Sequence, residues 1–172
     1  MSTQSNILVG CSNKVVWVRV EGKGSFLNSS GLKEFARAMI NRGHREFVVD
    51  LQQCPVMDST FMGTLAGIAL RLREIGQGAL HVIHLNERNG DLLRNLGLDR
   101  LFALDLCGLA PIPESEVSAQ TEPIETDAAG DRAAQAQTML EAHEALVEAS
   151  AGNLTKFKDV LEYLKQDLAH PE

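Results

Sequence analysis

The sequence contains little cysteine. Its three cysteines, Cys11, Cys54 and Cys107, lie far apart and show no metal-ligand spacing. An odd and scattered set is typical of free thiols in a reducing compartment, so we expect neither a disulfide framework nor a zinc site. Cys54 precedes Asp58 in a predicted loop, and a reactive thiol there is an alternative to an ordinary, partly buried cysteine.

Long apolar runs and an excess of positive charge are also absent. No apolar stretch approaches the roughly 20 residues that cross a membrane, and the polar residues 1–6 do not resemble a signal peptide. The formal net charge of −7 disfavours non-specific binding to nucleic acids and to anionic membranes. We therefore expect a soluble, cytoplasmic protein with no nucleic-acid or membrane partner.

Complete catalytic, metal and cofactor motifs are missing as well. Residues 22–25, Gly-Lys-Gly-Ser, do not form a nucleotide-binding loop, because Trp17 stands where the first glycine is needed and Gly24 where a hydroxyl is needed. His81 and His84 are three residues apart on a predicted strand, so they point to opposite faces and are expected to be structural. We predict no metal site, no cofactor and no enzyme activity.

The hydrophobic pattern predicts an α/β chain. An apolar fraction of 44% in 172 residues is sufficient for one well-packed domain plus an appendage. Helices are expected after the second, third and fourth strands, the first of them beginning at Asn28-Ser29-Ser30 and the last at Asn86. This alternation predicts a mixed sheet with helices packed against it. The predicted strands are residues 7–9, 15–20, 47–51, 79–85 and 101–106.

The stretch from residue 47 to residue 63 is the most informative part of the sequence. Residues 47–51 predict a buried strand, Pro55 prevents a direct continuation into a helix, and Asp58 and Ser59 carry the short oxygen-bearing side chains that begin helices. The pattern therefore places a hydroxyl beside a carboxylate at the N-terminus of a helix. Apolar residues then recur at spacings of three and four along this helix: Phe61, Leu65, Ile68, Leu72 and Ile75.

This position has two interpretations. The first amides of a helix are unpaired and carry partial positive charge, so a phosphoryl group on Ser59, with roughly −1.5 to −2 charges, would be tolerated there. Alternatively, Asp58 and Ser59 are only helix caps. The sequence suggests no histidine partner for Ser59, and Asp58 is an adjacent acid rather than a positioned base, so nucleophilic catalysis is not expected.

The same stretch resembles the signature of the STAS domain, as found in bacterial anti-sigma factor antagonists. The matching residues are Val56-Met57-Asp58-Ser59-Thr60 and Gly63, whereas Phe61-Met62 replaces the family's Gly-Leu. The resemblance covers roughly residues 6–107 and includes the order of the elements. It implies the STAS fold, and it places Ser59 on the family's phosphoacceptor serine, with Thr60 as the alternative.

The resemblance also implies partners. They are a serine-kinase anti-sigma factor or a related kinase-like regulator, bound when the serine is unphosphorylated and released when it is phosphorylated, and a PP2C-type phosphatase that restores the serine. The loop before the first helix lacks the family's acidic pattern, which makes the implied partner surface more basic. That surface consists of Asp58, Ser59, Thr60, Met62, Lys23 and Ser25.

The C-terminal part of the chain differs in composition. Residues 111–131 contain six acidic residues, three prolines and no lysine or arginine, which predicts a solvated linker. Apolar stripes in residues 132–149 and 154–168 then predict two amphipathic helices. We expect a STAS-like domain at residues 1–108, a linker at 109–131 and a helical hairpin at 132–172.

The two predicted helices cannot bury their apolar faces alone. They must dock on the preceding domain, on a second copy in a homodimer, or on a partner. The linker's reach of roughly 3.3 Å per residue also allows them to cover the Ser59 surface as an inhibitory lid. The predicted function is a phospho-regulated protein-binding switch. The alternative is a constitutive scaffold that assembles through these helices, with Ser59 only a helix cap.

Overall fold

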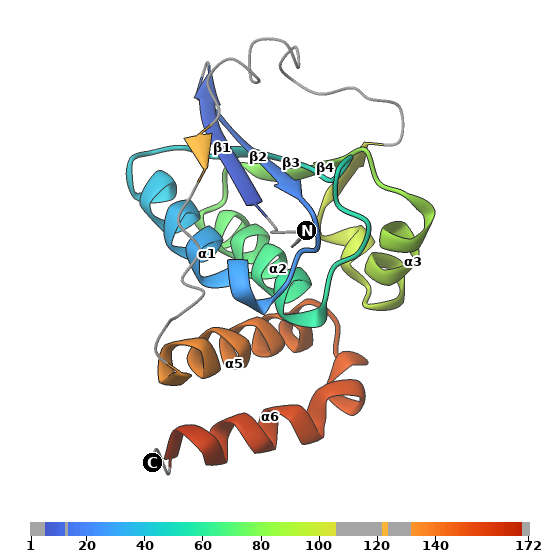
Figure 1. Cartoon of the computed structure of the whole chain (residues 1–172). Coiled ribbons are helices and arrows are strands. Elements are labelled where there is room, and N and C mark those ends of the chain that lie inside the picture. Colours follow the sequence, from blue (N-terminus) through green and yellow to red (C-terminus); the bar gives the residue numbers. More distant parts are fainter. Residues whose placement is uncertain (1–5, 13, 106–121, 124–131, 170–172) are drawn as a thin grey trace, which may run out of the picture.

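The chain forms a mixed sheet of six strands in the order β5-β4-β3-β2-β1-β6 (Figure 1). The computed structural model describes residues 6–12, 14–105, 122–123 and 132–169. β1 is antiparallel to β2 and to β6, whereas β2, β3, β4 and β5 are parallel neighbours. The strands are β1 (Asn6–Ser12), β2 (Val15–Glu21), β3 (Glu46–Asp50), β4 (Ala79–Ile83), β5 (Ala103–Asp105) and β6 (Glu122–Pro123).

Helices connect the parallel strands, as a parallel pair requires. The predicted α/β class, a mixed sheet with helices packed against it and two helices at the C-terminal end, is confirmed. The helices are α1 (Phe26–Asn41), α2 (Ser59–Ile75), α3 (Glu87–Asn95), the 3₁₀ turn η1 (Leu98–Arg100), α5 (Arg132–Ala149) and α6 (Asn153–Ala169).

The main core lies between the sheet and α1 and α2. Successive side chains of a strand point to opposite faces. In β2, Val16, Val18 and Val20 therefore enter this core, whereas Trp17 lies on the other face with Val48 and Ile83. The apolar stripe predicted for α2 is buried against the same sheet face, which fixes the orientation of the helix and hence the position of its first residue, Ser59.

The two C-terminal helices add further layers. α5 packs across α2 and α1, and α6 packs on α5 on the side away from the sheet (Figure 1). The hairpin therefore docks on the domain that precedes it. Of the three docking arrangements that the sequence left open, the chain adopts this one.

The start of α1 differs from the prediction. Asn28-Ser29-Ser30 were expected to cap the helix, but the N-cap is Ser25, whose hydroxyl accepts a hydrogen bond from the Leu27 amide. The Asn28 side chain accepts in turn from the Ser25 amide at 3.0 Å, which completes a capping box. The prediction was wrong because several short polar side chains follow one another, and only the backbone path selects which of them caps.

The strands at the sheet edges also differ. Of the strand expected at residues 101–106, the described part is β5, because Leu101 and Phe102 belong to the turn after η1, where both amides donate to the carbonyl oxygen of Leu98. β6 lies inside the segment predicted as linker and pairs with β1. Two residues are too few to show a strand pattern in a sequence. Cys107 lies outside the described residues.

In the part of the chain that the structure describes, no helix combines the length and the apolar character that crossing a membrane requires.

Gly24 joins the two loops that precede α1 and α2. Its amide donates to the carbonyl oxygen of Val56 at 3.0 Å, and the Asp58 amide donates to the carbonyl oxygen of Gly24 at 2.8 Å. The fully buried ring of Phe61 fills the space beside it: a Cβ at Gly24 would lie 2.7 Å from a ring carbon. The loops therefore approach one another because this position has no side chain.

We predict that Gly24→Ala lowers the free energy of unfolding by about 1–3 kcal/mol, the usual cost of overpacking a filled core. Urea denaturation of the full chain measures it. In a Phe61→Leu background the same substitution is expected to cost clearly less, since the ring that it meets is gone. Equal costs in both backgrounds would contradict the role given to this contact.

Candidate functional site

The candidate site is the N-terminus of α2, built around the carboxylate of Asp58. Asp58 has the extended conformation of an N-cap, with φ −89° and ψ 173°. One carboxylate oxygen accepts from the Phe61 amide at 2.8 Å, and the other accepts from the Phe26 amide at 3.0 Å. A single side chain thus caps α2, as predicted, and also binds the first amide of α1. Both helix N-termini converge on this carboxylate.

Ser59 follows as the first residue of α2. Its position beside unpaired amides of a helix N-terminus suits an anionic group on the hydroxyl, because those amides carry partial positive charge. The Asp58 carboxylate already accepts a hydrogen bond from one of the amides at this terminus, that of Phe61. A phosphorylated Ser59 would therefore lie between a favourable helix terminus and a like-charged neighbour.

The other residues predicted for the partner surface lie in different environments. Lys23 is exposed, whereas Ser25 is buried as the cap of α1. Thr60 and Met62 are buried beneath the surface in the described arrangement. The ring of Phe61, which replaces the family's glycine, is 0% exposed and points into the core, so it adds no bulk to the surface around Ser59.

The sequence suggested no histidine partner for Ser59, but the structure contains one. The Ser59 hydroxyl lies 2.9 Å from Nε2 of His143 on α5, across 84 residues of sequence. His143 Nδ1 lies 2.7 Å from the carbonyl oxygen of Met139 and must donate there. In a neutral ring Nε2 is therefore the acceptor, and the Ser59 hydroxyl donates to it. One signal was available: His143 lies on the apolar side of its predicted helix, where a buried polar group needs a partner.

α5 approaches α2 closely because α2 carries two glycines at the contact. A Cβ at Gly63 would lie only 2.2 Å from the carbonyl oxygen of Ala142, so no other residue fits there without moving α5. One turn further, a Cβ at Gly67 would lie 3.8 Å from the Ala145 methyl group, an ordinary contact distance. This close approach brings His143 within reach of Ser59.

Polar contacts hold α5 and α6 at both ends of the contact surface. Lys33 of α1 forms an ion pair with Glu141 at 2.7 Å. The side chain of Asn153, at the turn between α5 and α6, donates to the carbonyl oxygens of Leu96 at 2.9 Å and Leu146 at 2.7 Å. The ring of Phe157 on α6 packs edge-on against His143 with 5.1 Å between centroids. The hairpin is thereby fixed in one register on the domain.

Two further sequence predictions can be placed in the structure. Cys54 is buried, and burial raises the pKa of its thiol, which opposes the alternative of a reactive cysteine. His81 of β4 contacts Glu46 of β3 at 3.1 Å, and His84, directly after β4, contacts Asp50 of β3 at 2.9 Å. Both histidines therefore have partners that belong to the sheet.

A hydroxyl, an imidazole and a carbonyl in series resemble the arrangement of a nucleophile with its base. His143 is only 4% exposed, however, and neither of the two cavities described between α2 and its neighbours is lined by Ser59 or His143. Neither of these two cavities provides room for a substrate at the hydroxyl. The pair is better explained as a contact that fastens α5 to the site.

Comparisons with known proteins agree with this architecture. The sequence model of the STAS domain matches residues 6–118. No curated protein matches the chain. A putative anti-sigma factor antagonist from Thermotoga maritima is similar in structure, with 20% identity, a TM-score of 0.54, and coverage of 64% of this chain and 92% of that one.

Two other solved structures show the same fold. An anti-sigma factor antagonist from Mycobacterium paratuberculosis has 19% identity and a TM-score of 0.54, covering 70% of this chain and 97% of its own. The Bacillus cell fate determinant SpoIIAA in its phosphorylated form has 14% identity and a TM-score of 0.50, covering 64% and 94%. At these identities the likeness concerns the fold.

The ion pair between Lys33 and Glu141 predicts how α5 responds to acid. Burial opposes ionisation of Glu141, but the hydrogen bond and charge of Lys33, with smaller effects of Gln137 and Arg37, lower its pKa below the ordinary value of 4.5. A carboxylate with a lowered pKa stabilises docking above its ordinary pKa, and the contribution is lost as the pH falls through the lowered value.

We therefore predict that Glu141→Gln loosens α5 at pH 6 by the ~0.2–1 kcal/mol typical of a partly exposed pair. Hydrogen exchange of the α5 amides measures the change. The wild type and the variant should converge at acid pH, where Glu141 of the wild type is protonated and, like the glutamine of the variant, carries no charge. Glu144→Gln, on the exposed side of the same helix, is the control. A difference between wild type and variant that persists in acid would show that the ion pair is not its cause.

Proposed function

Because the chain belongs to the STAS family, we propose that it is a phospho-regulated, protein-binding switch of the anti-sigma factor antagonist type. The partner is a serine-kinase anti-sigma factor or a similar kinase-like regulator. It binds the surface around Ser59 while the serine is unphosphorylated and is released once the serine carries phosphate. A PP2C-type phosphatase returns the chain to its binding form. Thr60 is the less favoured acceptor, because it is buried.

The observation that carries this proposal is the position of Ser59 directly after the Asp58 cap, where two helix N-termini converge. A phosphoryl group there adds roughly −1.5 to −2 charges next to a fixed carboxylate. A partner that closes over the site must desolvate both charges. A loss of about 3 kcal/mol would weaken binding about a hundredfold, which is sufficient to exchange partners. A structural neighbour, SpoIIAA, is known in a phosphorylated form.

The docked hairpin adds a third state to this switch. α5 contacts Ser59 through His143, so the hydroxyl is already engaged by its own chain. A kinase needs the oxygen of Ser59 free for in-line attack, and a partner needs the surface around it. We therefore propose that α5 and α6 act as an intramolecular lid. The described arrangement is the closed form, in which both binding and phosphorylation are suppressed.

A lid of this kind weakens partner binding by a definable factor. If the open form is a fraction of the population, the apparent dissociation constant rises by the inverse of that fraction. A closed form favoured by 1.4 kcal/mol thus weakens binding about tenfold. Any second interaction that pulls α5 away would restore the full affinity.

One observation supports the scaffold alternative. Three apolar side chains on α6 are well exposed, namely Leu154 at 50%, Val160 at 40% and Tyr163 at 63%. Such side chains can support contacts between copies of the chain. A scaffold of this type would bind its partner whether or not Ser59 is phosphorylated. The effect of Ser59 phosphorylation on partner binding therefore distinguishes the two functions.

The first test is substitution of Ser59. Ser59→Asp is expected to weaken binding of the anti-sigma factor that copurifies with the chain by about tenfold or more, since it adds negative charge beside Asp58. Ser59→Ala should retain binding and prevent release. Thr155→Asp, which adds the same charge at an exposed position on α6, is the control. Affinity that is unchanged in both Ser59 variants would refute the switch and favour the scaffold.

The second test opens the lid through Gly63. Gly63→Ala places a methyl group where the Ala142 carbonyl lies, and should weaken docking of α5 by about 1–3 kcal/mol while it favours the α2 helix itself. Hydrogen exchange of the α5 amides should rise, and mass spectrometry of protein from its own cells should find Ser59 phosphorylated to a greater extent. Gly67→Ala, one turn away and at ordinary contact distance, is the matched control.

Faster exchange in α5 without any change in Ser59 phosphorylation or partner binding would show that the docked helix does not regulate the site.

A further inference from the structure

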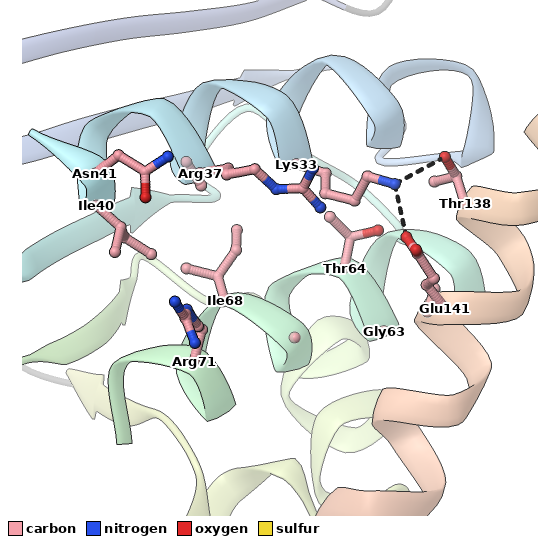
Figure 2. Close-up of a pocket in the computed structure, with 13 residues that line it drawn as sticks. Lys33, Arg37, Ile40, Asn41, Gly63, Thr64, Ile68, Arg71, Thr138 and Glu141 are labelled. Atoms are coloured by element: carbon pink, nitrogen blue, oxygen red, sulfur yellow. Dashed lines mark hydrogen bonds and ion pairs between the residues drawn. The ribbon is translucent and has the colours of Figure 1, made fainter. Parts of the chain in front are cut away.

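A cavity of about 430 Å³ lies between α1, α2 and α5 (Figure 2). This volume falls within the range of about 300–1,000 Å³ that is usual for small-molecule sites. It is bounded by one face of each helix, and Gly63 and Gly67 are among the residues that line it. The remaining lining residues are Lys33, Ala36, Arg37, Ile40, Asn41, Thr64, Ile68, Arg71, Thr138, Glu141 and Ala142.

The inner part of the cavity is apolar. Ile40 of α1 and Ile68 of α2 are 6% and 7% exposed, and Ala36 lies beside them. The nearby hydroxyl of Thr64 is satisfied by the carbonyl oxygen of Thr60 at 2.9 Å. This part therefore suits a hydrocarbon or ring and offers few polar groups of its own.

The outer part is positively charged. Three cationic side chains and one carboxylate line the cavity, and Lys33 is bound to that carboxylate, Glu141. Within the described residues, Arg37 and Arg71 pair with carboxylates of their own helices, Glu34 at 3.8 Å and Glu74 at 3.5 Å, in the loose geometry of surface pairs. In Figure 2 these two arginines come from α1 and α2, with Ile68 between them.

Arg37 and Arg71 thus place two positive charges beside the apolar inner part of the cavity, in a chain with a net charge of −7. A guanidinium group presents a planar set of donors that matches a carboxylate or phosphate. We propose that this cavity binds a small amphipathic carboxylate, with its anionic group held by Arg37 and Arg71 and its hydrocarbon part against Ile40 and Ile68.

A neighbouring cavity indicates which way the anionic group faces. That cavity also reaches Arg71 and is lined by Arg73, but four carboxylates outnumber these two arginines. An anion is repelled from that side and is directed toward Arg37. The carboxylates are Glu74, Glu141, Glu144 and Glu148.

Binding here would be linked to the position of the hairpin. α5 supplies one wall of the cavity through Thr138, Glu141 and Ala142, so the complete site exists only while α5 is docked. A ligand that binds one form stabilises that form by mass action. Its effect on partner release rests on the proposed function, whereas binding to the cavity does not.

The test uses octanoate as the probe and octanamide, its neutral counterpart of the same length, as the comparison. Titration of the full chain, followed by NMR chemical shifts, should show octanoate binding at least tenfold more tightly, with shifts mapped to α1, α2 and α5. Arg37→Gln and Arg71→Gln should each reduce this preference at least threefold. Arg94→Gln, the same charge change on α3 and outside the cavity, should leave it unchanged.

Equal affinities for the two probes, or an equal effect of Arg94→Gln, would overturn the site. Gly63→Ala should weaken octanoate binding because it displaces the α5 wall, and undiminished binding would overturn the link to α5. Ser59→Ala and Ser59→Asp are measured with the same probe. If octanoate binds while partner binding is the same in wild type and both Ser59 variants, the cavity site is upheld and the switch is refuted.

Discussion

One carboxylate fixes the geometry of the surface around Ser59. Asp58 binds the Phe61 amide of α2 and the Phe26 amide of α1, so the two helices that cover the sheet begin at a common point. Removing this side chain would leave donors of two helices unsatisfied at once, each at a typical cost of about 1 kcal/mol. The position of Ser59 next to it follows from chain connectivity. The capping of both helices and the placement of Ser59 are therefore one feature of this protein.

The close contact between α2 and α5 has a different physical basis. Caps and ion pairs orient the hairpin. The short distance between α2 and α5 arises because Gly63 and Gly67 have no side chains where they face Ala142 and Ala145. Small residues allow backbones to approach, and the surface so formed is specific because a single methyl group disturbs it. Gly63 and Gly67 also line the cavity beside Lys33. The contact and the cavity thus share two residues of α2.

The parts of this structure that could be predicted are those set by local rules. The Asp58 cap of α2 and the Asn86 cap of α3 each depend on a few neighbouring residues, and both are confirmed. The cap of α1 and the strand β6 were missed, since adjacent polar residues compete in one case and the strand is too short in the other. The contact of Ser59 with His143 joins positions 84 residues apart, and periodicity carries no information on such pairs. The buried orientation of Phe61 likewise depends on Gly24 in another loop.

The covalent connection between the hairpin and the domain has a consequence for dosage. A separate inhibitor would occupy the Ser59 surface to an extent that varies with its concentration in the cell. A helix on the same polypeptide is present at a fixed ratio of one to one, and its effective concentration does not change with expression. Synthesis of more chain would then supply more regulator without altering the fraction held closed. The threshold of response would be encoded in the side chains of α5, and variation at Ala142 or His143 could tune it.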